Sequence, residues 1–240
     1  MKSGLVAVVG RANAGKSTLI NVLVGEKVAI VSPKPQTTRD RILGVLTTDD
    51  YQIAFIDTPG IYKADNLLNS VMQKTTADAS QDVDLVLFIM DAHEGISDTD
   101  RTLLKKYSKL SMPTILVLTK TDIMTEALLI AELKELSTEN MDIVPVSARK
   151  NKNVKELIKV ILDKLPEGEK LFSEDIVSDR SEKFMISEIM REKILLEFSD
   201  KKPLFYRACL MAMKTLGVEK DYTTKHLEMA YALQQSERGA

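Results

Sequence analysis

The segment Gly10–Ser17, which reads GRANAGKS, constrains the fold of this chain more than any other part of the sequence. It matches the pattern G-x-x-x-x-G-K-[ST], follows the apolar run Leu5–Val9 and opens a helical pattern. This context between a strand and a helix separates a phosphate-binding loop from a chance match. The glycines let the backbone wrap around a phosphate, whose charge is attracted by the N–H groups and dipole at the helix start. The sequence therefore predicts a P-loop NTPase.

The same segment and one later motif supply the residue types that bind phosphates and a metal ion. We expect Lys16 to contact the β- and γ-phosphates of a nucleotide and the Ser17 hydroxyl to bind Mg²⁺. Asp57-Thr58-Pro59-Gly60 ends another apolar run. Asp57 is expected to act on Mg²⁺ through a water molecule, and the Gly60 N–H to contact the γ-phosphate. The full expected set around the phosphates is Gly10, Arg11, Ala12, Asn13, Ala14, Gly15, Lys16, Ser17, Thr18, Asp57 and Gly60.

Two further motifs predict that the base is guanine. Thr119-Lys120-Thr121-Asp122 and Ser147-Ala148 each follow an apolar run. The Asp122 carboxylate can accept hydrogen bonds from the N1–H and the amino group of guanine. Adenine lacks both donors in that arrangement and would leave a carboxylate unpaired. The stem of Lys120 can cover the plane of the base, so Thr119, Lys120, Asp122, Ser147 and Ala148 form the expected base site.

Apolar runs alternate with helical patterns as far as residue 166, which predicts an α/β fold. We expect a doubly wound, mostly parallel six-stranded sheet with one hairpin at Thr48-Asp49-Asp50. The expected strands are 5–9, 42–46, 51–56, 84–90, 114–119 and 142–146, and the expected helices are 16–24, 66–80, 98–109, 126–136 and 154–165.

Pro166-Glu167-Gly168-Glu169 interrupts this pattern and marks the expected domain boundary. Residues 1–166 would form the nucleotide domain, and residues 167–240 a small, mainly helical C-terminal segment. Within that segment helices are expected at 181–198, 204–216 and 223–235.

Composition narrows the setting in which the protein acts. The formal net charge of −2 gives no overall attraction to nucleic acid or anionic lipid, and no DNA partner is expected. A single cysteine excludes an internal disulfide framework. No uncharged apolar run is long enough for a spanning helix. We expect a cytoplasmic monomer, with a peripheral contact to the inner membrane left open.

The motifs GRANAGKS, PQTTRD, DTPG, TKTD and VSARK, in this order and spacing, resemble the G domain of the Era family of bacterial GTPases. Related GTPases of ribosome assembly and tRNA modification share much of this set. Residues 31–39 resemble the first switch of the Era family. Residues 178–193 resemble the entry to its C-terminal RNA-binding KH domain. The resemblance covers about residues 1–198.

The resemblance implies a GTP/GDP switch with Mg²⁺ that assists maturation of the small ribosomal subunit and its 16S rRNA. It assigns Thr38 as the switch threonine that meets Mg²⁺ and the γ-phosphate. It also aligns Asn13 with a P-loop asparagine that binds K⁺ in some members, so K⁺ is expected to stimulate turnover. Ile61 stands where Ras-like enzymes have a water-orienting Gln, and slow intrinsic hydrolysis is therefore expected. The expected catalytic groups are Lys16, Asn13, Thr38 and Gly60.

Two departures from the family modify these expectations. Thr119 stands where Era proteins usually have Asn, which would weaken nucleotide binding by about 1 kcal/mol for one hydrogen bond. No G-x-x-G motif follows residue 166, and residues 167–240 hold 12 Lys and Arg against 14 Asp and Glu. We therefore expect a degenerate or truncated KH-like segment with an atypical tail. We do not expect this segment to clamp RNA directly. The alternatives are a nucleotide-gated module that docks protein or membrane surfaces, and a GTPase of tRNA modification.

Overall fold

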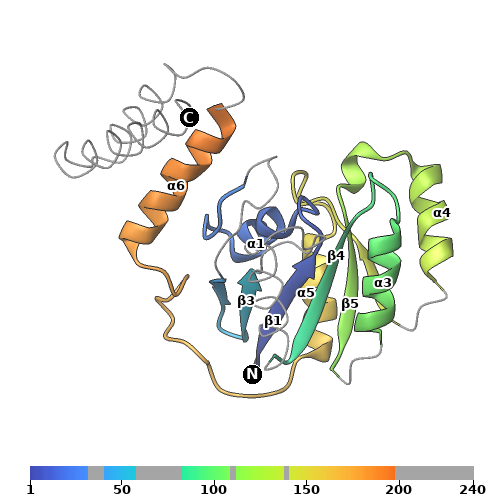
Figure 1. The fold of residues 1–240 in the computed structure, drawn as a ribbon. Coiled ribbons are helices and arrows are strands. Elements are labelled where there is room, and N and C mark those ends of the chain that lie inside the picture. The colour runs from blue at the N-terminus through green and yellow to red at the C-terminus, as the bar shows by residue number, and fades with distance from the viewer. Residues whose placement is uncertain (32–40, 58–82, 109–111, 138–140, 198–240) are drawn as a thin grey trace, which may run out of the picture. The chain divides into compact units, whose positions relative to one another are not determined.

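The structure is a computed structural model that describes residues 1–31, 41–57, 83–108, 112–137 and 141–197 (Figure 1). The chain divides into two compact units, Met1–Arg180 and Ser181–Ala240. The predicted helices at 66–80, 204–216 and 223–235 lie outside the described residues, as do Thr38, Gly60 and Ile61.

The first unit is built on a six-stranded sheet with the strand order β2-β3-β1-β4-β5-β6 (Figure 1). Strand β2 is antiparallel to β3, and every other neighbouring pair is parallel. This arrangement confirms the predicted mostly parallel sheet with a single hairpin. The strands are β1 (Lys2–Gly10), β2 (Ile42–Thr47), β3 (Tyr51–Asp57), β4 (Leu85–Asp91), β5 (Thr114–Thr119) and β6 (Asp142–Pro145).

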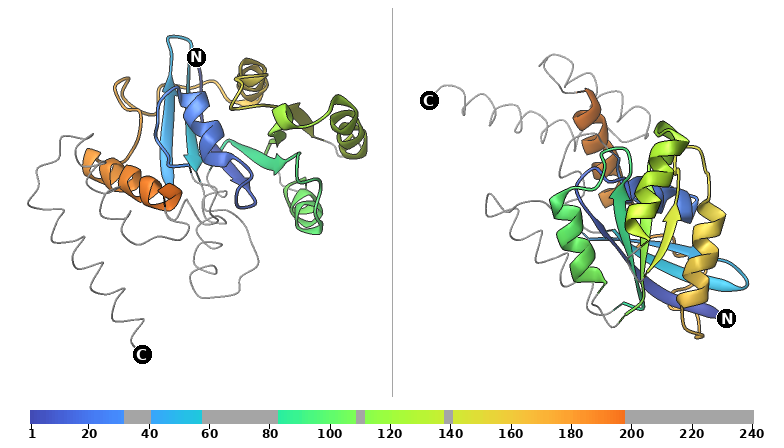
Figure 2. Two further views of the ribbon diagram at one scale, coloured as in Figure 1. Left: turned by 90° about the horizontal axis from the view of Figure 1, so that it is seen from above. Right: turned by 90° about the vertical axis from the view of Figure 1, so that its right-hand side faces the viewer.

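Helices cover both faces of this sheet (Figures 1 and 2). Side chains alternate along β1, so that Val6 and Val8 join the core under α1 and α5, while Ala7 and Val9 join the core under α3 and α4. Burial on both faces explains why the strands read as continuous apolar runs. The helices are α1 (Lys16–Val24), α3 (Asp98–Tyr107), α4 (Glu126–Leu136) and α5 (Val154–Lys164), with a short 3₁₀ helix at Thr121–Ile123.

The position of β1 determines where a ligand can bind. This strand lies between β3 and β4, the point at which the strand order reverses. In open α/β sheets, ligands bind beyond the carboxyl ends of the strands at such a reversal. The carboxyl ends of β1, β3, β4, β5 and β6 all lie at this edge because these strands are parallel.

A strap of residues 166–180 follows α5 and runs along the first unit. At its start, the Ser3 N–H donates to the Pro166 carbonyl at 3.2 Å. Near its end, the Val45 N–H donates to the Val177 carbonyl at 2.8 Å. These contacts attach the strap to the rest of the first unit, whereas the division into domains at residue 166 stays a prediction.

The described part of the second unit is helix α6 (Glu182–Glu197), close to the predicted helix at 181–198. Ser181 begins it: its carbonyl accepts from the Met185 N–H at 3.0 Å, and its hydroxyl accepts from the Phe184 N–H at 3.3 Å. None of the helices within the described ranges is both long and apolar enough to span a lipid bilayer.

Candidate nucleotide site

The P-loop, Gly10–Ser17, joins β1 to α1 in a conformation that its residues allow. A Cβ atom on Gly10 would lie 2.3 Å from the Ile89 carbonyl oxygen, so only glycine fits against β4. Asn13 has a φ of 62° and Gly15 a φ of 91°, in the left-handed region that Gly and Asn tolerate best. The sequence therefore selects a turn that directs the chain around the start of α1.

Lys16 is buried in this loop, with an exposed fraction of 6%. Its Nζ donates to the carbonyl oxygens of Gly10 at 3.1 Å and Arg11 at 2.9 Å. Burial lowers the pKa of Lys16 to about 8, and the negative charge of Asp57 partly opposes that shift. A phosphate in the loop would give this buried amine an anionic partner, and the role of Lys16 in binding phosphates stays a prediction.

The two residues predicted to act on Mg²⁺ meet directly. Ser17, in the first turn of α1, donates its hydroxyl hydrogen to Asp57 Oδ2 at 2.7 Å. Asp57 is fully buried at the end of β3. A hydroxyl and a carboxylate are hard oxygen donors of the kind that Mg²⁺ prefers, so this pair fits the ion.

Asp122 and Ser147 come together at the carboxyl end of the neighbouring strands. The Ser147 hydroxyl donates to Asp122 Oδ1 at 2.6 Å and accepts from the Lys150 N–H at 3.1 Å. The Ser147 bond lowers the pKa of Asp122, and the charges of Arg149 and Lys150 contribute further. Asp122 is therefore an ionised acceptor whose orientation is fixed, as guanine recognition requires. Ala148 follows in the turn, where its carbonyl accepts from the Asn151 N–H at 3.3 Å.

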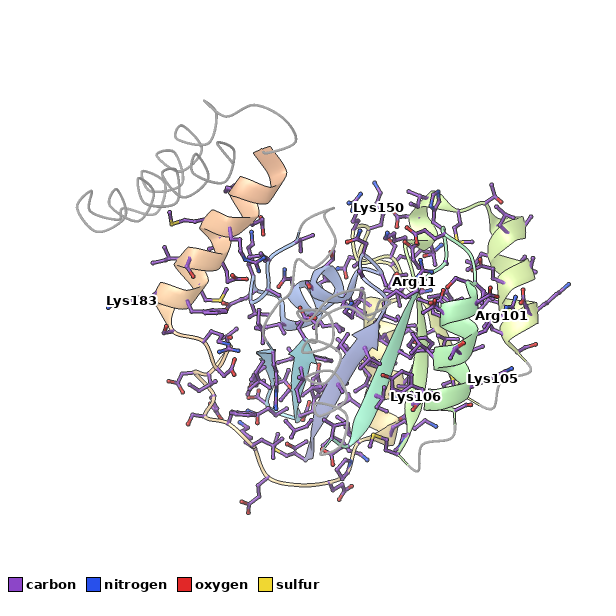
Figure 3. The ribbon with its side chains drawn as sticks, in the orientation of Figure 1. Arg11, Arg101, Lys105, Lys106, Lys150 and Lys183 are labelled. Atoms are coloured by element: carbon purple, nitrogen blue, oxygen red, sulfur yellow. The ribbon has the colours of Figure 1, made fainter. Side chains whose placement is uncertain are left out.

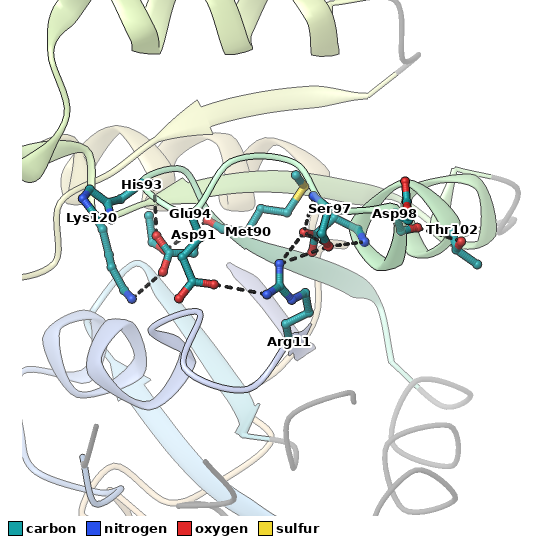
Figure 4. Close-up of polar contacts among 11 residues, drawn as sticks. Arg11, Met90, Asp91, His93, Glu94, Ser97, Asp98, Thr102 and Lys120 are labelled. Atoms are coloured by element: carbon teal, nitrogen blue, oxygen red, sulfur yellow. Dashed lines mark hydrogen bonds and ion pairs between the residues drawn. The ribbon is translucent and has the colours of Figure 1, made fainter. Parts of the chain in front are cut away.

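Lys120 is held by an acid that the sequence analysis did not single out. Its ammonium group pairs with Asp91 Oδ2 at the end of β4 (Figure 4). Lys120 also has a φ of 60°, unusual for a residue with a Cβ. The pairing fixes the end of the Lys120 side chain, so its stem is available to cover a base. The sequence does place an acidic residue, Asp91, at the carboxyl end of β4, which is the one signal from which this partner of Lys120 could have been predicted.

Thr119 connects the base loop, Thr119–Asp122, to the P-loop. Its hydroxyl donates to the Ala14 carbonyl at 2.6 Å, in a buried position.

Arg11, predicted only as part of the phosphate loop, directs its side chain toward the start of α3 (Figure 4). Ala12 and Thr18 are half-buried within and just after the loop.

A P-loop after the central strand and an aspartate-bearing base loop two strands further along define the class of P-loop GTPases. Residues 5–120 match the family described as 50S ribosome-binding GTPase. The GTPase Era of Clostridium botulinum (strain Alaska E43 / Type E3) is 43% identical over 230 residues, which are 95% of this chain and 77% of that protein. The chain therefore belongs to the Era family and is a GTP-hydrolysing enzyme.

Two solved structures of Era are similar to this chain. One is Era in complex with MgGDPNP and nucleotides 1506–1542 of 16S ribosomal RNA, with a TM-score of 0.78 and 41% identity over 85% of this chain and 70% of that one. The other is a variant of Aquifex aeolicus Era bound to GDP and AlF₄⁻, with a TM-score of 0.78, 40% identity and the same coverage. The predicted resemblance over residues 1–198 is confirmed, and the alignment to the clostridial protein extends past residue 198 because it covers 95% of the chain.

Proposed function

We propose that this protein is a GTP-operated switch that assists maturation of the small ribosomal subunit. The observation that carries the proposal is the convergence of three groups at one edge of the sheet: buried Lys16, the Ser17–Asp57 pair and the Asp122–Ser147 pair. These are a cation for phosphates, oxygen donors for Mg²⁺ and an oriented acceptor for guanine. The similar Era structures with MgGDPNP and with GDP and AlF₄⁻ support GTP, GDP and Mg²⁺ as the ligands.

In this proposal the P-loop binds the phosphates through its backbone N–H groups, and Lys16 exchanges its two carbonyl partners for phosphate oxygens. Ser17 would hold Mg²⁺ through its hydroxyl oxygen, and Asp57 would act on the ion through a water molecule. The ion would supply positive charge that neutralises the phosphates. Thr38 and Gly60, assigned by their motifs, would contact the γ-phosphate and lose that contact on hydrolysis, which gives the switch its two states.

Asn13 is the proposed contact for a monovalent cation. It is exposed in the P-loop, and its side chain carries an amide oxygen, a ligand type that suits a monovalent cation. A K⁺ ion beside the β- and γ-phosphates would supply positive charge where Ile61 cannot orient a water molecule. We therefore include K⁺ as a proposed stimulator of turnover.

The proposed partner is 16S rRNA of the small subunit, as in the similar Era complex. Action on that RNA would place the protein in the cytoplasm, with contact to the inner membrane as a peripheral association at most. A monomer is proposed because nucleotide, metal and base groups all come from one chain.

Nucleotide uptake is the direct test of the first half of the proposal. Purified protein with Mg²⁺ should bind labelled GTP and GDP, and a large excess of unlabelled ATP should not displace them. Failure to bind GTP, or equal competition by ATP, would contradict the assignment of both the base site and the phosphate site.

RNA binding tests the second half. Filter binding with an RNA of the 3′ end of small-subunit rRNA should increase when GDPNP replaces GDP, with a tRNA of similar length as the control. RNA binding that does not depend on the bound nucleotide, or no RNA binding at all, would favour the module that docks protein or membrane surfaces. Preference for tRNA would favour the tRNA-modification class instead.

A further inference from the structure

The side chain of Arg11 leaves the P-loop and reaches the start of α3 (Figure 4). Its NH1 donates to Asp100 Oδ2 at 2.8 Å and to the Ser97 hydroxyl at 3.0 Å. Its NH2 donates to Glu94 Oε2 at 3.1 Å. The guanidinium therefore contacts three polar side chains of the segment 94–100, all of them more than eighty residues away in the sequence.

Asp100 is a rigid anchor because its own helix fixes it. It is buried, and its Oδ2 accepts from the Ser97 N–H at 3.0 Å and from the Ser97 hydroxyl at 2.6 Å. Ser97 in turn caps the Asp100 N–H at 3.2 Å, so the two residues form a reciprocal capping box at the start of α3. The hydrogen bond from Arg11 thus ends on a carboxylate whose position is already determined. This bond also raises the pKa of Arg11, because it favours the charged form of the guanidinium.

The backbone of Arg11 is part of the phosphate site. Its carbonyl accepts from Lys16 Nζ at 2.9 Å and from the Ala14 N–H at 3.4 Å. Asn13 and Gly15, next to this carbonyl's partners, adopt left-handed conformations that neither helix nor sheet supports. Fixing the side chain of Arg11 therefore fixes the part of the loop that has no regular secondary structure to hold it.

We propose that the Arg11–Asp100 pair positions the P-loop for phosphate binding, so that α3 supports the nucleotide site. Arg11 and Asp100 are then positioning residues, because their side chains act through the loop backbone rather than on the phosphates. Arginine suits this role because its planar fork can meet several acceptors at once, whereas lysine offers a point charge. This inference rests on the proposed nucleotide function.

The test uses the full chain with the variants Arg11→Met, Arg11→Lys, Asp100→Asn and the double variant Arg11→Met/Asp100→Asn. Asp100→Asn retains an acceptor for the cap and removes the charge that holds Arg11. GDP and GDPNP affinity should fall roughly three- to tenfold in Arg11→Met and in Asp100→Asn, the range expected for the loss of one typical hydrogen bond. Arg11→Lys should recover part of the loss. The double variant should be no weaker than the worse single variant, because both remove one shared interaction.

The control is Arg101→Met on the same helix (Figure 3), which removes the exposed ion pair of Arg101 with Glu135 at 2.5 Å. It should bind GDP as the wild type does. The ratio of GTP to ATP affinity should also stay constant in every variant, because the base loop is not affected. A role confined to folding would lower the melting temperature of the variants. It would leave their GDP affinity at the wild-type value, with no loss for Arg11→Lys to recover.

Wild-type GDP affinity in Asp100→Asn, or additive losses in the double variant, would overturn this inference while leaving the proposed function intact. Failure of the wild type itself to bind GDP would overturn both. The wild-type arm therefore distinguishes the two failures.

Discussion

The hydroxyl of Thr119, at the end of β5, donates a hydrogen bond to the carbonyl oxygen of Ala14 in the P-loop at 2.6 Å. Thr119 is 2% exposed, and the Met90 carbonyl lies 3.0 Å from the same hydroxyl. A hydroxyl has one hydrogen to give, and the shorter contact assigns it to Ala14. A threonine thus joins the base loop to the P-loop, although the sequence suggested that this position was weakened by the lack of an asparagine.

Thr119→Val should remove this connection while preserving the shape of the side chain. The Ala14 carbonyl would lose its buried partner, and GDP affinity should fall about fivefold, as expected for about 1 kcal/mol. Thr119→Ser should retain the affinity. Thr114→Val, at the other end of β5, removes only a long contact to the Tyr107 carbonyl at 3.4 Å and serves as the control. Isothermal titration of GDP measures all three, and equal affinities would contradict the role of the hydroxyl.

Asp122→Asn should change which base the protein prefers. An ionised carboxylate accepts from the N1–H and the amino group of guanine, whereas an amide presents a donor to one of them. Xanthine carries a carbonyl in place of that amino group, so the variant should lose GTP affinity by at least about tenfold and gain XTP affinity. Competition between labelled GTP and unlabelled XTP gives the ratio. Asp142→Asn, an exposed carboxylate that pairs with Lys164 at 2.8 Å, should leave the ratio unchanged.

The sequence predicted those features that depend on local pattern. Helices α1 and α4 have the predicted bounds. Ser17 and Asp57 meet because β1, which leads into the P-loop, and β3, which ends with Asp57, both end at the same edge of the sheet. Asp100 and Asp91 were missed because their partners Arg11 and Lys120 are 89 and 29 residues away, a separation that no periodicity encodes. Hydrophobic spacing reports which face of an element is buried, but it does not report which polar side chains meet across the fold.

The strap supplies a further example of a contact hidden in the sequence. Gln52, fully buried in β3, accepts from the N–H groups of Leu171 at 2.7 Å and Phe172 at 2.9 Å, and donates to the Phe172 carbonyl at 2.9 Å. Gln52→Met keeps the volume and removes every one of these bonds. It should lower the free energy of unfolding by about 2–4 kcal/mol, several hydrogen bonds at about 1 kcal/mol each.

Urea denaturation measures that loss. Glu174→Gln is the matched control within the strap, because it removes only an exposed ion pair with Lys170 and should unfold at the wild-type midpoint. A Gln52→Met midpoint equal to that of the control would mean that the strap is not held by this side chain.

The depressed pKa of Lys16 predicts a pH dependence of stability in the nucleotide-free protein. The pKa is about 8 in the folded state and 10.5 for an unperturbed lysine, so between these values the unfolded chain binds the additional proton. Stability therefore rises with pH through this window, because the cost of burying the charge is complete below about pH 8 and is relieved above it.

Lys16→Met has no such group and provides the reference. The advantage of this variant over the wild type in free energy of unfolding should shrink by about 2 kcal/mol between pH 7 and pH 9.5. Denaturation with urea at several pH values measures the difference, in which the titration of other groups cancels. A constant difference across this range would contradict the assigned pKa.

Asn13→Gly tests the proposed monovalent cation at the P-loop. Glycine accepts the φ of 62° at this position without strain, so the variant removes the amide oxygen and leaves the turn intact. In the wild type, GTP hydrolysis should be faster in K⁺ than in Na⁺ at equal ionic strength, because K⁺ adds positive charge where the γ-phosphate leaves. In Asn13→Gly the two salts should give the same rate, while GDP affinity in Na⁺ stays near that of the wild type. Equal wild-type rates in the two salts would exclude the cation, and a K⁺ preference that survives in Asn13→Gly would assign it to other ligands.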